Sequence, residues 1–281
     1  MRVKKLNFTS LNDRVFFVGD VHGRYALLLE QLESVLFSPE NGDVLVSVGD
    51  IIDGGFENDD MIRLLDEPWF NVAYGNHEQL MKRATKSITE EDFDRVSSFL
   101  IDQGGLQMVY DLNNDIATVD SIKKVAESLT KKELHWVANG GAWFYDVFYA
   151  KGFAYRRAQA AKLFQAELPL AIEVNHPKGR VGVVHAGLKG NNWNNIEFIA
   201  RYRPNQLLWM RDHIMAFEND EKPAVKLGLV QGVDALVVGH SVPKRGLPLI
   251  LANTMYIDVG AKQGKPPFVI EITDVLNAVM K

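Results

Sequence analysis

The sequence has 281 residues, of which 47% are hydrophobic and 24% charged, and this composition is typical of a globular protein. The net charge of −5 offers no basic excess for a general nucleic-acid binder, and the absence of cysteine excludes disulfides and thiolate sites. Any bound metal must therefore be held by Asp, Asn, Glu, His or backbone oxygens. The first residues, MRVKKLNFTSLNDR, lack an apolar signal region, and no apolar stretch is long enough to span a bilayer. We therefore expect a cytoplasmic protein without a membrane partner.

Three segments near the start of the chain repeat one pattern of an apolar run, a polar turn and a helical stretch. The runs are RVFFVGD, DVLVSVGD and WFNVAYGNHE, and helical spacing follows them over residues 25–37, 58–67 and 79–86. This alternation predicts βαβ units in a layered α/β core. Ligands of such cores bind at the carboxyl ends of the strands, where all three Gly-Asp or Gly-Asn turns would lie.

Residues 88–168 have helical spacing and few β-branched runs, so we predict a mainly helical insertion there. The strand pattern then returns, because LPLAIEV and RVGVVHAG predict a hairpin. A helix is predicted over 204–217, and VDALVVGHS, PLILANT, MYIDVG and PFVIEI predict a second set of strands. We expect two packed sheets flanked by helices, in a single domain over residues 1–281.

Five of the apolar runs are followed by short motifs: GDVHG at 19–23, GDIID at 49–53, GNHE at 75–78, HAG at 185–187 and GHS at 239–241. One such turn alone is more often a helix cap or a structural turn than a binding site, but five at one sheet edge favour a shared site. Carboxylate, imidazole and carboxamide groups suit two divalent cations, with Mn²⁺, Fe and Zn²⁺ as candidates. A carboxylate can bridge two ions about 3.5–4 Å apart. The motifs supply Asp20, His22, Asp50, Asp53, Asn76, His77, His185 and His240.

In this order the motifs resemble those of metallophosphoesterases of the phosphoprotein phosphatase type, in particular the bacterial and bacteriophage serine/threonine phosphatases of the phage lambda protein phosphatase kind. The stretches NGGAWF, LPLAIEV and LLWMRD resemble the same branch. The single histidine of GHSVP differs from the GHxH pair of many other metallophosphoesterases. The resemblance implies a calcineurin-like, two-sheet metallophosphoesterase sandwich. It also implies the host cytoplasm as the location if the protein is phage-encoded.

The resemblance further implies a binuclear metal centre, with Mn²⁺ expected first, that hydrolyses phosphate esters by direct attack of a hydroxide bridging the two ions. His77 would protonate the leaving oxygen as general acid, and Asp53 would orient its imidazole. The implied metal ligands are Asp20 and His22 for the first ion, Asp50 for both ions, and Asn76, His185 and His240 for the second.

The sequence departs from the resemblance at two positions. Relatives read GDxxDRG and RGNHE, and their two arginines clamp the phosphate, but Gly54 and Tyr74 stand at those places here. Neither residue supplies a bidentate guanidinium. Arg211 of LLWMRD corresponds to a third family arginine, and we expect Arg211 and Asn76 to bind the substrate phosphate. Compensating cations could come from Arg24, Arg156 or Arg157.

The leading hypothesis is a serine/threonine protein phosphatase, with phosphotyrosine as a further substrate, acting on a phosphorylated protein, a peptide or a small phosphate ester. The first alternative is a dinucleoside polyphosphate or other nucleotide or phosphodiester hydrolase, although those dinucleotide enzymes read GDLVARG and have alanine where this chain has Asp53. A weaker alternative is a non-catalytic phosphate-binding relative, supported only by the two missing arginines. The aromatic cluster at 143–145 is interpreted as core packing, with a wall of the substrate cleft as its alternative.

Overall fold

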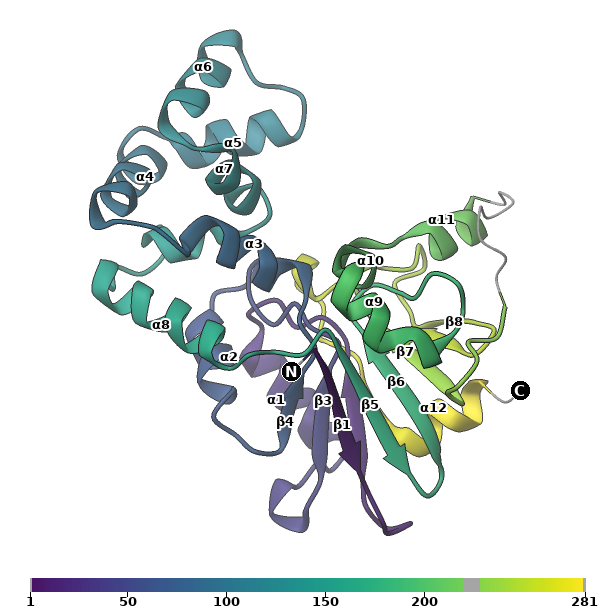
Figure 1. Ribbon diagram of the computed structural model, residues 1–281. Helices are drawn as coiled ribbons and strands as arrows, with labels where there is room; N and C mark the ends of the chain where they lie inside the picture. Colours follow the sequence, from purple (N-terminus) through teal and green to yellow (C-terminus); the bar gives the residue numbers. More distant parts are fainter. Residues whose placement is uncertain (1, 220–227, 280–281) are drawn as a thin grey trace.

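Two β-sheets packed face to face form the centre of the protein in the computed structural model (Figure 1), which describes residues 2–219 and 228–279. In spatial order the four-stranded sheet contains β10 (Val269–Glu271), β2 (Val15–Val18), β3 (Val44–Ser47) and β4 (Phe70–Val72). The six-stranded sheet contains β1 (Val3–Asn7), β5 (Ala171–His176), β6 (Gly179–Val184), β7 (Ala235–Val238), β9 (Thr254–Tyr256) and β8 (Leu249–Leu251). The predicted two-sheet α/β architecture is confirmed.

Strand β2 illustrates how the sequence fills both sides of its sheet. All four of its residues are buried. Val15 and Phe17 belong to the apolar cluster between the two sheets, whereas Phe16 and Val18 belong to the cluster on the outer face. Successive side chains of a strand point to opposite faces, so an uninterrupted apolar run suits a strand that is covered on both.

Helices cover the outer faces of both sheets. The outer cluster of the four-stranded sheet includes side chains of α1 (Tyr25–Ser34), α2 (Asn58–Leu64) and α3 (Asn76–Thr85). The cluster on the six-stranded sheet includes side chains of α9 (Ile196–Tyr202), α10 (Pro204–Trp209) and α11 (Asp212–Glu218). The C-terminal helix α12 (Ile272–Val279) buries Val275 and Leu276 in the cluster between the sheets. Short 3₁₀ turns lie at η1 (Pro39–Asn41) and η3 (Trp193–Asn195).

The insertion is helical, as predicted. Figure 1 shows helices α4 to α7 as a lobe that stands beside the sandwich, and α7 and α8 pack against α3. Because α3 begins within the third strand-end motif, this packing brings the insertion to the edge of the sheet where the motifs lie. Its elements are α4 (Glu90–Asp102), α5 (Gly105–Asn113), α6 (Val119–Ser128), α7 (Lys131–Val137), η2 (Gly141–Tyr145) and α8 (Phe153–Gln165).

The structure differs from the sequence predictions in three places. The single helix predicted over 204–217 is two helices, because Met210 is extended (ψ 129°) between α10 and α11. Strand β10, predicted among the second set of strands, pairs antiparallel with β2 in the first sheet. The sequence analysis anticipated neither β1 nor α12, since charged residues interrupt β1 and α12 directly follows a strand.

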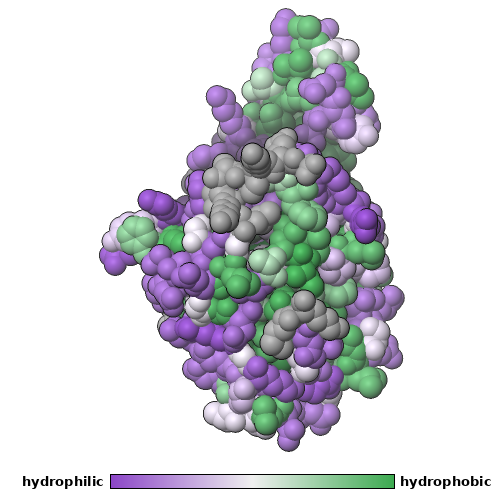
Figure 2. All heavy atoms as spheres, turned by 90° about the vertical axis from the view of Figure 1, so that its right-hand side faces the viewer, coloured by the Kyte–Doolittle hydropathy of each residue, from purple (hydrophilic) through white to green (hydrophobic). Residues whose placement is uncertain are grey.

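The C-terminal half of the chain carries an apolar surface. Figure 2 shows a band of hydrophobic residues down the face that this half forms. Exposed apolar side chains of this half include Phe217, Leu229, Leu247 and Ile250. A hollow of about 450 Å³ beside Phe217 and Leu247 shares no lining residue with the polar pocket described below. Within the described ranges, no helix is long and apolar enough to cross a membrane.

Candidate metal centre and active site

The five motifs meet at one edge of the sandwich because each follows a strand of a parallel set. β2, β3 and β4 run parallel in one sheet, and β6 and β7 run parallel in the other. Four of the motif side chains sit at positions with left-handed backbone, where φ is between +51° and +72°. Such conformations cost on the order of 1 kcal/mol each in non-glycine residues and concentrate at functional sites. These four residues are His22, Asp50, Asp53 and His240.

Two glycines of the motifs are required by close packing. A Cβ at Gly75 would lie 2.2 Å from Asp50 Oδ1, and one at Gly239 would lie 2.0 Å from Asp20 Oδ1. The carboxylates therefore occupy the space that any other side chain would need. Fully buried Glu78 fixes the same turns, since its carboxylate accepts the backbone N–H groups of Asp50, Ile51 and Gly75 at 2.9–3.0 Å.

Asp50 lies at the centre of the site. Its Oδ2 is 3.2 Å from Nε2 of His185, 3.8 Å from Nε2 of His77 and 4.0 Å from Nε2 of His22. Its Oδ1 accepts the backbone N–H of His77 at 2.9 Å. Burial raises the pKa of Asp50, but His185 and His77 outweigh this effect and hold the pKa well below its usual range. A carboxylate shared by three imidazoles can serve two cation sites.

Hydrogen bonds to backbone carbonyls set the tautomers of two histidines. Nδ1 of His22 lies 3.1 Å from the Ile52 carbonyl, and Nδ1 of His185 lies 3.1 Å from the Val48 carbonyl. Because a carbonyl only accepts, each Nδ1 must donate, and Nε2 is the atom that each ring presents to the site. Nε2 of His185 faces another acceptor, Oδ1 of Asn76, at 2.7 Å. Lone pairs that converge in this way fit a bound cation.

The other donors of the site also fit metal ions. Burial lowers the pKa of His22 to about 3 and that of His240 to about 2, so both rings stay neutral. Nε2 of His240 is buried and has no partner among the described residues. Among the described residues, two groups of three residues have ligand atoms within 4.8 Å of one another, and Asp50 belongs to both groups. These groups are His22, Asp50 and His77, and Asp50, His185 and His240.

Asp258 is a buried acid of the site that the sequence analysis did not select. Burial, together with Asp258 and Asp50, raises the pKa of Asp20 well above its usual range. Burial and Asp50 likewise raise the pKa of Asp258 itself. Crowded carboxylates of this kind favour a site that receives positive charge. The signal was available, since MYIDVG ends a strand with Asp and Gly like the selected motifs.

Asp53 and His77 form a hydrogen-bonded pair, and two tryptophans of the insertion donate hydrogen bonds to the Asp53 carboxylate. Nδ1 of His77 lies 2.8 Å from Oδ2 of Asp53. The indole N–H groups of Trp136 and Trp143 donate to the same carboxylate at 2.9 and 2.7 Å. Burial lowers the pKa of His77, but Asp50 and Asp53 outweigh this effect and raise it above its ordinary value. Trp143 is thus buried, as predicted, and also positions the pair, which no local sequence pattern indicated.

The motif residues line a polar pocket of about 320 Å³. Arg211 lies on its wall, in the break between α10 and α11, and not on a helix face. Asp53 and His185 lie behind this lining, with 0% of their surface exposed. The pocket is lined by Asp20, His22, Asp50, Asn76, His77, Asn139, Trp209, Arg211, His240, Val242, Asp258, Lys262 and Gln263.

The sequence matches the calcineurin-like phosphoesterase family over residues 13–244. The chain belongs to this family. Membership makes it a metal-dependent phosphoric ester hydrolase, and it confirms the resemblance from which the site residues were inferred.

Curated relatives of this phosphoesterase match most of its length. It is 28% identical to serine/threonine-protein phosphatase 2 of Escherichia coli (strain K12), over 88% of this chain and 87% of the relative. It is also 28% identical to serine/threonine-protein phosphatase 1 of Salmonella typhimurium, over 89% and 88% of the two chains. Among solved structures, a candidate diadenosine tetraphosphatase has a TM-score of 0.50 at 18% identity, over 96% and 94% of the chains. A cold-active protein tyrosine phosphatase has a TM-score of 0.51 at 14% identity, over 97% and 77%.

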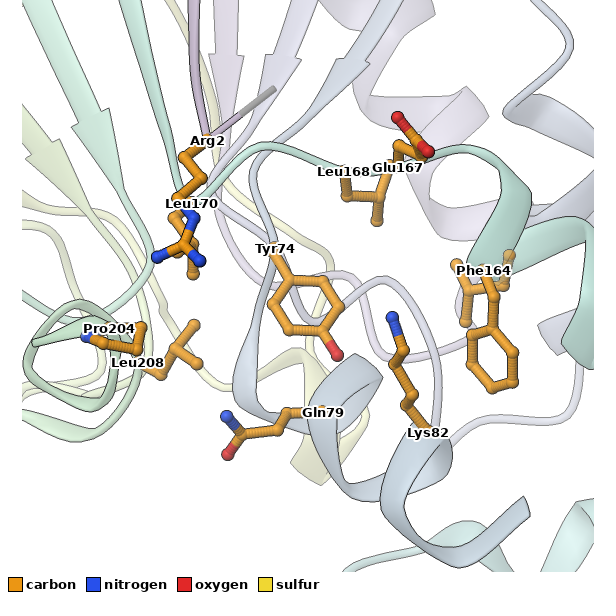
Figure 3. Close-up of a pocket in the computed structure, with 11 residues that line it drawn as sticks. Arg2, Tyr74, Gln79, Lys82, Phe164, Glu167, Leu168, Leu170, Pro204 and Leu208 are labelled. Carbon is orange, nitrogen blue, oxygen red and sulfur yellow. The ribbon is translucent and has the colours of Figure 1, made fainter. Parts of the chain in front are cut away.

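The phosphoesterase has no arginine at the two positions where the resemblance leads us to expect one. Gly54 lies beside the pocket with φ at +81°. Tyr74 lines a different hollow, of about 500 Å³, in which its side chain lies near Lys82 of α3 (Figure 3). This hollow and the polar pocket share no lining residue, so Tyr74 does not take part in the candidate site.

The three arginines named as candidates for compensation lie outside the wall of the polar pocket. Buried Arg156 pairs with Asp59 at 3.2 Å and with Asp146 at 2.9 Å. The guanidinium of exposed Arg157 lies over the Phe153 ring. Nε of Arg24 donates to the Ala261 carbonyl at 3.4 Å, and this side chain is not part of the pocket wall. None of the three arginines lines the polar pocket, so the structure gives no support to the suggestion that they compensate.

Proposed function

We propose that this phosphoesterase is a phosphomonoesterase of the serine/threonine protein phosphatase type, acting on phosphorylated proteins or peptides. The observation that carries the proposal is the Asp53–His77 pair, with its 2.8 Å hydrogen bond beside a set of metal-ligating groups. A general acid held in this way suits the expulsion of an alkoxide such as that of serine. The near full-length match to two bacterial serine/threonine phosphatases supports the same substrate class.

Each motif residue has a role in the proposed mechanism. Two divalent ions, with Mn²⁺ to be tested first, would lower the pKa of a water molecule and offset the charge of the phosphate. His77 would donate the proton on Nε2 to the leaving oxygen, while Asp53 holds Nδ1. Arg211, on the pocket wall, and Asn76 would orient the phosphoryl group. The ions would be held by Asp20 and His22 on one side, Asp50 between them, and Asn76, His185 and His240 on the other.

A dinucleoside polyphosphate hydrolase is the second candidate function. A candidate diadenosine tetraphosphatase has the same fold at a TM-score of 0.50. The dinucleotide hydrolases that the sequence resembles have alanine where this chain has Asp53. In this chain Asp53 accepts three hydrogen bonds from side chains. These hydrogen bonds fix the Asp53 carboxylate beside His77, and this arrangement favours the phosphatase over the dinucleotide hydrolase.

The two candidates can be separated by comparing substrates on one preparation. The protein is stripped with a chelator, reloaded with Mn²⁺, and assayed on phosphoserine and phosphothreonine peptides, a phosphotyrosine peptide and diadenosine tetraphosphate. We expect Mn²⁺-dependent phosphate release from the phosphoserine and phosphothreonine peptides with kcat/KM at least about 10-fold above that for the dinucleotide. The reverse preference would favour the hydrolase, and no release from any substrate would overturn the proposed activity.

A further inference from the structure

Lys262 places a positive charge in the pocket that none of the motifs explains. It lies in the 3₁₀ turn η4 (Ala261–Gln263), after strand β9, and lines the same pocket as Arg211 and His77. Lys262, His22 and His77 line the same pocket, so the charge of Lys262 opposes protonation of both imidazoles. No motif of the sequence analysis includes this residue.

The ammonium group of Lys262 has little to bind within the protein. Its hydrogen-bond partner is the neutral Oδ1 of Asn139, at a long 3.5 Å. Among the described residues no carboxylate forms an ion pair with it within 4.0 Å. Burial lowers the pKa of Lys262, and the more distant Asp53, Asp50 and Asp20 offset this effect only in part. Most surface lysines are hydrated or paired, so a partly buried ammonium with one weak partner is available to an anionic ligand.

The stem of Lys262 passes over Gly54, one of the two positions that lack the expected arginine. A Cβ at Gly54 would lie 3.2 Å from Cγ of Lys262 and 3.7 Å from Cβ of His22. A Cβ at Gly140 would in turn lie 2.7 Å from the backbone nitrogen of Gly54. The absence of a side chain at Gly54 thus lets both Lys262 and the insertion approach the second motif.

We propose that Lys262, together with Arg211, binds the phosphoryl group of the substrate and replaces the arginine that is missing at Gly54. This inference rests on the proposed function, because it names the cation that positions that substrate. Arg24 supports this role of Lys262, because its hydrogen bond to the Ala261 carbonyl stabilises the turn that contains Lys262. An ammonium is a point charge without the fork of a guanidinium, so Lys262 contributes more to phosphate affinity than to orientation.

The test measures phosphate binding, so it does not depend on turnover. Inorganic phosphate is titrated by calorimetry into Mn²⁺-loaded wild-type protein and into Lys262→Met, Lys262→Arg and Lys265→Met. Lys265 is the matched control, because it is exposed, lies three residues away on the same segment and is not part of the pocket wall. A separate Mn²⁺ titration of each variant shows whether the metal sites are intact.

We expect Lys262→Met to weaken phosphate binding about 10-fold to 100-fold, while Lys262→Arg recovers most of the affinity and Lys265→Met leaves it unchanged. Mn²⁺ affinity should stay the same or increase in Lys262→Met, because a positive charge has been removed near the cations. Wild-type affinity in Lys262→Met, or no phosphate binding by wild type, overturns the inference. Failure of the proposed function is a different result, namely phosphate binding without hydrolysis of any ester.

Discussion

The strand-end turns and the helical insertion both reach the candidate site, but they do so by different means. The turns supply groups such as Asp50 and His185, each of which lies within three residues of the end of a strand and within a short sequence motif. The insertion supplies Trp136 and Trp143, which reach Asp53 from 83 and 90 residues away along the chain. Each candidate metal ligand is therefore marked by its own local motif, whereas the support of the candidate general acid depends on packing that no local motif marks.

The largest expected effect is at the turns. Asp50→Asn removes a charge shared by both candidate ion sites, and we expect kcat to fall by about 10³-fold or more because several kcal/mol of charge stabilisation are lost. The measurement is Mn²⁺-dependent hydrolysis of p-nitrophenyl phosphate. Asp43→Asn is the matched control at the other end of β3, since Asp43 is 2% exposed and pairs with Arg14 at 3.1 Å. Comparable losses in both variants would show that burial, and not metal binding, decides the result.

Metal binding should also raise the thermal stability of the folded protein. Asp20, Asp50 and Asp258 crowd the site, so bound cations should stabilise the folded state. At a free Mn²⁺ concentration of about 1,000 times the Kd, the gain is about 4 kcal/mol, and Tm should rise by on the order of 10 °C. The shift is measured by calorimetry of stripped and reloaded protein. It should be largely lost in Asp50→Asn, and an equal shift in that variant would place the ions elsewhere.

The fold and the residues that gather at the candidate site could be predicted from the sequence because both depend on local patterns. Apolar runs followed by Gly-Asp turns place Asp20 and Asp50 at one sheet edge whatever the rest of the chain does. Asp258 also lies just after a strand, in MYIDVG, and could have been selected although no glycine precedes it. Lys262 and Trp136 could not, because a lysine in a polar loop and a tryptophan on a helix have no signature until the chain has folded around them.

A smaller effect is expected within the insertion. Trp143→Phe removes the 2.7 Å hydrogen bond to Asp53, so the Asp53–His77 pair should lose orientation and kcat should fall about 10-fold, with KM nearly unchanged. Trp193→Phe is the control, because Trp193 donates to buried Glu173 at 2.7 Å outside the candidate site. Both variants should lose similar stability, and only Trp143→Phe should change turnover. An unchanged kcat in Trp143→Phe would show that Trp143 contributes to packing and not to turnover.

The smallest expected effect is at the junction of the two regions. Gly54→Arg should not restore the clamp of the family, because φ is +81° and Cγ of Lys262 occupies the path of the side chain. We expect a loss of about 1–2 kcal/mol in the free energy of unfolding and no decrease in KM for a phosphomonoester. Gly54→Ala measures the effect of backbone strain without the bulk of the arginine side chain. A decrease in KM for Gly54→Arg would mean that Lys262 does not replace the arginine.

The general-acid role of His77 is tested most directly by the dependence of its effect on the leaving group. His77→Asn is compared with wild type on p-nitrophenyl phosphate, whose leaving group needs little protonation, and on a phosphoserine peptide, whose alkoxide needs a proton. If His77 donates the proton, kcat should fall about 10²-fold to 10⁴-fold on the peptide and markedly less on the aryl ester. Equal losses on both substrates would contradict proton donation and assign His77 to metal or phosphate binding.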